Sequence, residues 1–390
     1  MNWQEKLPEV LTRLQSDVEE ADWKWLTSQV ALDCPDLDKM EPDEVRRRFA
    51  FKTGINNSRL TRTFIWQAWL KIMVKEYEPV MGNIRSFWYQ HLENFYRSHG
   101  LFTPTALEPP TEEPYIQSAI PPDDGSPRSE DEALDEDPVR WKRTSAEDKL
   151  INTMTEVMSK FVEHHIFRYQ DEFSFQIPMD SRCLVGRDRR KMLFFTEKEG
   201  MWWLCNQLHK ARNKRSISVM ASRGEPSYLT LEYFADQLAA LGVSELLIAT
   251  LCDFDPWGFW ISWNLDHKFR SFCSKQKDKD GKLIPFFKVT TYLLTTPDLF
   301  TPEQIKAGRD LSKFKDQTLI QNWLKVTHGV HGKPIGLHID VVNPRLKRQR
   351  VDDWIEDILA HVKPPYPTLP KKAPGKMSKV LLPNDTFGES

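Results

Sequence analysis

The pattern of apolar and polar positions divides the chain into two regions of different architecture. Residues 58–78 place apolar side chains at helical spacing, which predicts an amphipathic helix with one buried face. A second apolar stripe runs over residues 84–96, with Asn83 as a helix cap and Gly100 as a stop. Short helices joined by a tight turn favour a winged-helix or helix-turn-helix module within residues 1–102.

After residue 145 the pattern changes to apolar runs of the kind found in buried parallel strands. There are three of these runs, at residues 192–196, 216–221 and 246–252. Helical patterns separate them, at residues 199–212 and 230–242. This alternation predicts an α/β domain with a doubly wound parallel sheet over residues 145–363. Ligands of such sheets bind at the carboxyl ends of the strands.

Charge is distributed unevenly along the chain. The segment 103–139 contains eleven acidic residues, one basic residue and eight prolines, so its net charge is −10. The whole chain carries −2, which leaves +8 for the rest. We therefore expect residues 103–144 to be a disordered linker and the remainder to favour a polyanion. The basic, proline-rich residues 364–390 are predicted to form a flexible tail.

Composition also narrows the cellular setting. No window of about 18 uncharged apolar residues occurs, so no membrane span is expected. Glu5 and Glu9 lie where a signal peptide would be apolar. The five cysteines form no CxxC pair, which favours a reducing compartment and argues against a structural zinc site. We expect a protein of the cytoplasm or nucleoid, or of the nucleus in a eukaryote.

Three acidic residues follow two of the predicted strands. Glu197 comes directly after residues 192–196, and Asp253 and Asp255 come directly after residues 246–252. Carboxylates crowded at one sheet edge repel one another unless a cation neutralises them, and oxygen ligands suit Mg²⁺ or Mn²⁺. The alternative for a lone DxD is an exposed turn.

A possible nucleophile lies in the first region. Tyr89 follows Trp88 and so lies about 100° from the apolar stripe, which predicts a partly exposed phenol. Arg85 is four residues earlier, on the same helix face. Such a pair can hold and attack a phosphodiester, although a surface tyrosine packed on Trp88 is the plainer interpretation.

Four motifs together resemble the family of the topoisomerase VI A subunit and the eukaryotic meiotic double-strand-break transesterase. They are the run Arg85-Ser86-Phe87-Trp88-Tyr89, the strand end Glu197-Lys198-Glu199, the turn Gly224-Glu225-Pro226-Ser227 and the run Asp253-Phe254-Asp255-Pro256-Trp257-Gly258. Their order and spacing agree with the family over about residues 60–275. The resemblance implies a winged-helix (CAP-like) domain followed by a Toprim domain with a Rossmann-like parallel sheet.

The resemblance also implies residue roles. Tyr89 would be the nucleophile and leave a 5′-phosphotyrosyl link, while Arg85 would hold the scissile phosphate. Asp253 and Asp255 would bind Mg²⁺ (or Mn²⁺), with Glu197 as a further ligand or as the acid–base partner of the leaving 3′-oxygen. A homodimer would cut double-stranded DNA. No Gly-rich phosphate loop is present, so strand passage would need a separate ATPase or complex subunit.

Basic clusters outside these motifs are candidates for phosphate contacts. The residues that we select are Arg46, Arg47, Arg48, Arg189, Arg190, Lys214 and Arg215. For each cluster alone, a solvated surface is the default interpretation.

Two alternatives to the transesterase stay open. The first is a hydrolytic Toprim nuclease similar to the nuclease subunit of Wadjet-type plasmid-defence complexes, in which metal-activated water attacks and no covalent intermediate forms. Trp88, which stands where the family usually has Tyr or Phe, leaves room for this alternative. The second is a catalytically silent DNA-binding or scaffold subunit. The three retained acids, Glu197, Asp253 and Asp255, argue against it.

Overall fold

The computed structural model describes residues 2–49, 58–77, 84–102, 146–169, 182–222, 224–313 and 316–370. The predicted linker 103–144 and residues 371–390 of the predicted tail lie outside these ranges. Within the described ranges, no helix has the length and apolar character needed to cross a membrane.

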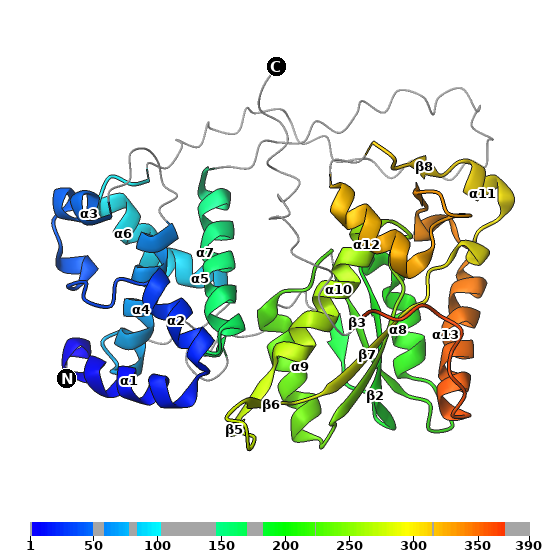
Figure 1. Cartoon of the computed structure of the whole chain (residues 1–390), viewed down its shortest axis with the longest axis horizontal. Helices are drawn as coiled ribbons and strands as arrows, with labels where there is room; N and C mark the ends of the chain where they lie inside the picture. The colour runs from blue at the N-terminus through cyan, green and yellow to red at the C-terminus, as the bar shows by residue number, and fades with distance from the viewer. Residues whose placement is uncertain are drawn as a thin grey trace, which may run out of the picture.

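Every element that the structure describes before residue 170 is helical (Figure 1). In chain order these elements are α1 (Trp3–Asp17), α2 (Glu20–Gln29), the 3₁₀ turn η1 (Leu37–Lys39), α3 (Pro42–Phe49), α4 (Ser58–Met73), α5 (Ile84–Phe87), the π-helical turn η2 (Trp88–Leu92), α6 (Glu93–Ser98) and α7 (Ala146–Glu163). The described residues of this part therefore include no strands of a wing, and the winged-helix domain stays a prediction.

Helix α4 is the centre of the helical part. The helix predicted from residues 58–78 is confirmed over Ser58–Met73 only, and it is buried on nearly all sides between Leu60 and Ile72 rather than on one face. The reason is tertiary, because α1, α2 and α7 all pack against α4. The buried Lys71 is neutralised there by Asp36, whose Oδ1 lies 2.6 Å from Nζ.

Residues 84–98 form a helical stretch interrupted by the π-helical turn η2. The predicted cap, Asn83, lies outside the described residues. The predicted stop is confirmed, because α6 ends at Ser98 and Gly100 follows with a φ of +61°.

The second part contains a five-stranded sheet in the order β1-β3-β2-β4-β7. Its strands are β1 (Arg182–Leu184), β2 (Arg189–Thr196), β3 (Ile217–Ala221), β4 (Glu245–Thr250) and β7 (Lys288–Leu293). β2 pairs in parallel with both β3 and β4, and β4 pairs in parallel with β7. Only the edge strand β1 is antiparallel in this sheet. The three predicted strands and the α/β class are confirmed.

Helices cover both faces of the sheet (Figure 1). The apolar cluster on one face includes residues of α9 (Tyr228–Ala240) and α10 (Pro256–Ser271). The cluster on the other face includes residues of α8 (Trp202–His209) and α13 (Pro344–Leu359). Neighbouring strand residues alternate between the two clusters, as Leu193 and Phe194 do. Because both faces are covered, β3 is buried along its whole length and β2 is buried from Met192 to Thr196.

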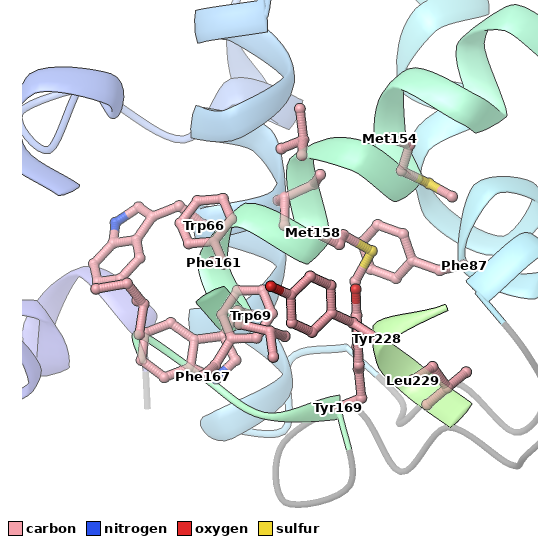
Figure 2. Packing of buried hydrophobic residues seen from close by; sticks show 14 of the residues in the cluster. Trp66, Trp69, Phe87, Met154, Met158, Phe161, Phe167, Tyr169, Tyr228 and Leu229 are labelled. Atoms are coloured by element: carbon pink, nitrogen blue, oxygen red, sulfur yellow. The ribbon is translucent and has the colours of Figure 1, made fainter. Parts of the chain in front are cut away.

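The helical part and the sheet part share one apolar cluster. Figure 2 shows Tyr228 and Leu229, at the start of α9, beside Tyr169 and Met158. A polar contact reinforces this junction, because His165 Nε2 lies 2.9 Å from the carbonyl oxygen of Ser271, the last residue of α10. Helix α7, which follows the linker in the sequence, packs against α4 of the helical part.

The remaining elements lie around the sheet. They are η5 (Glu199–Met201), β5 (Cys273–Lys277), β6 (Leu283–Pro285), η6 (Pro297–Leu299), α11 (Pro302–Lys306), β8 (Arg309–Asp310), α12 (Gln317–Thr327), β9 (Ile335–Gly336) and η7 (Ile339–Val341). The first residues of the predicted tail are packed rather than free, because Leu369 N donates to Thr291 O on β7 at 3.0 Å. The folded part therefore extends at least to residue 370.

Candidate metal site at the carboxyl edge of the sheet

The structure brings Glu197 and Asp253 together beyond the carboxyl ends of β2 and β4. Glu197 follows the last residue of β2, and Asp253 lies three residues after β4. Because these strands are parallel neighbours, both chain segments emerge at the same sheet edge. The backbone N–H of Asp253 donates to Glu197 Oε1 at 2.8 Å. Glu197 and Asp253, which the sequence predicted to lie at the same sheet edge, are therefore in contact.

The protein environment makes the carboxyl groups of Glu197 and Asp255 costly to ionise. Burial raises the pKa of Glu197 to about 7, and the charges of Asp253 and Asp255 add to this effect. Lys198 and the Asp253 N–H act in the opposite direction. Burial also raises the pKa of Asp255. A set of acids held under such repulsion is typical of a site that accepts a cation or transfers a proton.

Lys198 supplies the positive charge that the acids face. Its Nζ lies 2.9 Å from Asp253 Oδ2 and 3.8 Å from Glu197 Oε1. The same ammonium lies 3.6 Å from Asp340 Oδ2. Three carboxylates from distant positions in the sequence therefore surround one lysine.

Sequence reasoning missed the segment His338–Asp340. This segment reaches the site because Phe254 and Leu337 form an antiparallel bridge, with an N–O distance of 2.8 Å from Phe254 N to Leu337 O. Ile339 N then donates to Asp253 Oδ1 at 2.8 Å, and His338 Nδ1 lies 3.3 Å from Asp253 Oδ2. Nothing in the local sequence connects these residues with Asp253, which lies 85 positions before His338, because these contacts form only when the chain folds.

Asp255 has a defined structural role. It caps α10, and its Oδ1 accepts a hydrogen bond from Gly258 N at 2.7 Å. The turn is so tight that a Cβ on Gly258 would lie 2.2 Å from the carbonyl oxygen of Asp253. Gly258 is thus required for the close approach of α10 to the acidic loop.

The carboxylate groups of Glu197 and Asp253 are of the chemical type that binds a hard divalent cation. Carboxylate oxygens are the preferred ligands of Mg²⁺, and Glu197 and Asp253 are only 8% and 11% exposed. Over the described ranges, no three His, Cys, Asp or Glu side chains form a group that could hold a metal ion as they stand. Lys198 is the group that now occupies the position between the acids.

Tyr89 lies in the helical part, on the π-helical turn η2. It is 52% exposed, whereas Trp88 beside it is fully buried, which confirms the predicted exposure of Tyr89. The turn is anchored by His91, whose ring stacks on Tyr77 with centroids 4.4 Å apart. π-Helical turns occur frequently at functional sites. The side chain of Arg85 lies outside the described part of the chain.

The basic residues predicted to contact phosphates lie away from the acidic site. Arg189 and Arg190 begin β2, at the end opposite Glu197, and the strand's eight residues separate the two ends by about 23 Å. Lys214 joins Arg189 there, because its carbonyl oxygen accepts a hydrogen bond from Arg189 Nε at 3.1 Å. Arg215 precedes β3 and pairs with Glu356 at 2.6 Å.

The remaining basic candidates, Arg46, Arg47 and Arg48, are exposed on α3 of the helical part. Arg46 pairs with Asp43 and Arg48 with Asp33. The structure thus separates the basic candidates into distinct surfaces, and those on the sheet part lie at the edge of the sheet opposite Glu197.

Fold and site together define a mixed α/β protein with an acidic cluster at the carboxyl edge of a largely parallel sheet. Comparisons with protein-family models, with curated proteins and with solved structures found no match to this chain.

Proposed function

We propose that the protein cleaves double-stranded DNA in a reaction that depends on Mg²⁺ or Mn²⁺, with Tyr89 as the nucleophile. The observation that carries the proposal is the contact between Glu197 and Asp253 at the carboxyl edge of two parallel strands. Buried acids at such an edge fit phosphoryl chemistry assisted by a divalent cation. The sequence resemblance to the topoisomerase VI A family points to the same chemistry.

Each residue has a definite part in the proposed reaction. The phenol of Tyr89 loses its proton to solvent water, and its oxygen forms a bond to phosphorus while the bond from phosphorus to the 3′-oxygen breaks. Glu197, whose pKa of about 7 allows it to carry a proton at neutral pH, gives that proton to the leaving 3′-oxygen. A cation held by Asp253 and Asp255 would supply positive charge beside the phosphate. The covalent link keeps the phosphoester available for religation.

The position of Tyr89 supports its role as an attacking group. Its phenol is half exposed on a turn whose neighbours, Phe87 and Trp88, are buried, so the backbone that carries it is well anchored. The tyrosine and the acids belong to different parts of the chain. A homodimer in which the tyrosine of one protomer meets the acids of the other is consistent with that division.

Hydrolysis is the second candidate, and the pKa of Glu197 is equally consistent with it. A carboxyl group with a pKa of about 7 is half ionised at neutral pH and can accept a proton from an attacking water. In that reaction water takes the place of Tyr89, and the DNA ends carry no protein.

A plasmid cleavage assay with Mg²⁺ or Mn²⁺ separates the two candidates. Reactions are stopped with detergent and divided into samples with and without protease, for the wild type and for Tyr89→Phe. Transesterification predicts protein-linked 5′ ends and no cutting by Tyr89→Phe. Hydrolysis predicts protein-free ends and undiminished cutting by that variant. Tyr233→Phe, at a half-buried tyrosine of α9, is the matched control and should cut normally in both cases.

A second variant tests whether Asp253 and Asp255 are needed for DNA cleavage. Asp253→Asn combined with Asp255→Asn should abolish cutting in both mechanisms and leave DNA binding in a gel-shift assay unchanged. Cutting that survives this double substitution would refute the proposed site.

A further inference from the structure

Lys198 occupies a position that a cation between the acids would need. Its ammonium contacts Asp253 Oδ2 at 2.9 Å, and Asp340 Oδ2 lies 3.6 Å away. The Oδ1 atom of Asp253 is already engaged, because it accepts a hydrogen bond from Ile339 N at 2.8 Å. A cation that binds Asp253 Oδ2 therefore has to compete with Lys198, which is closer to this atom than His338 Nδ1 at 3.3 Å.

The acids are held in place, whereas the lysine side chain is able to move. Glu197 and Asp253 are 8% and 11% exposed, and Lys198 is 28% exposed. Lys198 N is bonded to Thr196 Oγ1 at 3.2 Å, and Lys198 O accepts a hydrogen bond from Met201 N at 2.9 Å. The backbone is thus anchored on both sides, and the flexible four-carbon side chain is the part that can turn toward solvent.

From this geometry we infer that Lys198 is an internal counter-ion that holds the acidic site together in the absence of metal and is displaced when a divalent cation binds. The inference rests on the proposed metal-dependent function and adds that a metal ion must displace the Lys198 ammonium in order to bind. Without metal, the ammonium offsets the repulsion among Glu197, Asp253 and Asp340. With metal bound, the ammonium is repelled by the cation and becomes free to meet an anionic phosphate at the same edge.

Removal of the ammonium should therefore make the site bind metal more tightly. The test is calorimetric titration of the full chain with Mn²⁺ in the absence of DNA, which reads metal affinity independently of cleavage. We expect Lys198→Met to bind Mn²⁺ about tenfold more tightly than the wild type, because a charge-assisted contact no longer has to be broken. Without metal, Lys198→Met should melt at a lower temperature than the wild type. Saturating Mn²⁺ should remove this difference in melting temperature.

Lys191→Met is the matched control. Lys191 is the third residue of β2, toward the end opposite Glu197, and forms an exposed ion pair with Glu245 at 3.1 Å. Its removal deletes the same charge from the chain and should leave Mn²⁺ affinity unchanged. If Lys198→Met does not fold, Lys198→Gln, which keeps a polar side chain of similar length, takes its place with the same expected result.

The outcomes separate this inference from the proposed function. If the Lys198 variants bind Mn²⁺ with the wild-type affinity or more weakly, while the wild type binds metal and cuts DNA, the counter-ion role is wrong and the proposed function stands. If the wild type itself binds no Mn²⁺, both the metal site and the counter-ion role are refuted. Tighter binding by the Lys198 variants, together with an unchanged Lys191→Met, supports the inference.

Discussion

Gly258 provides the sharpest test of how the fold builds the acidic site. In Gly258→Ala the new Cβ would lie 2.2 Å from the carbonyl oxygen of Asp253 and 3.0 Å from its carbonyl carbon. Non-bonded heavy atoms pack at about 3.5 Å, so the start of α10 and the acidic loop must separate by about 1 Å. That movement pulls Gly258 N away from Asp255 Oδ1, which it now contacts at 2.7 Å.

A displacement of this size should reduce function more than stability. A 1 Å misplacement of reacting groups costs about 100-fold in rate, so we expect cleavage by Gly258→Ala to fall by about that factor. Overpacking of this kind destabilises a fold by about 1–3 kcal/mol, which leaves most of the protein folded. The assays are plasmid cleavage, Mn²⁺ titration and thermal unfolding of the same preparation.

Gly200→Ala is the matched control. Gly200 lies three residues after Glu197, and a Cβ there would have no neighbour within 4 Å. This variant should cut DNA and bind Mn²⁺ as the wild type does. If Gly258→Ala does the same, the close approach of α10 to Asp253 does not position the site, and the reasoning from the clash is wrong.

Three further predictions concern stability. Burial raises the pKa of Glu197 from its ordinary 4.5 to about 7, so its ionisation opposes folding above pH 7 and ceases to do so as the pH falls toward 4.5. Metal-free Glu197→Gln should therefore be more stable than the wild type by about 3 kcal/mol at pH 8 and equally stable near pH 4.5, as read by denaturant unfolding. Burial opposes protonation of His165, but its bonds to Asp22 and to a backbone carbonyl raise its pKa to about 10. Its contribution is therefore present below pH 6.5 and lost as the pH rises through 10, and His165→Gln should cost about 3 kcal/mol at pH 6 and little above pH 10. Ser227→Ala removes the cap whose Oγ accepts Thr230 N at 3.2 Å, and we expect a loss of about 1 kcal/mol, whereas an unchanged melting temperature would contradict the cap's contribution.

The sequence alone determined the α/β class and the three central strands, although it did not predict β1 or β7. The apolar runs at 192–196, 216–221 and 246–252 became the central strands β2, β3 and β4, because strands covered on both faces contain few polar residues. The meeting of Glu197 with the acids after β4 was also predictable, since parallel neighbours end at one edge.

Only the tertiary structure decided what completes the site. His338 and Asp340 reach Asp253 through the bridge between Phe254 and Leu337, a contact that no local pattern encodes. The burial of α4 on nearly all sides depends in the same way on α7, which comes from beyond the linker. Periodicity reports which side of an element is apolar, whereas long-range packing decides which distant segment covers it. For this reason the sequence predicted that Glu197 and Asp253 share one sheet edge, whereas only the fold shows that Lys198 lies between Asp253 and Asp340.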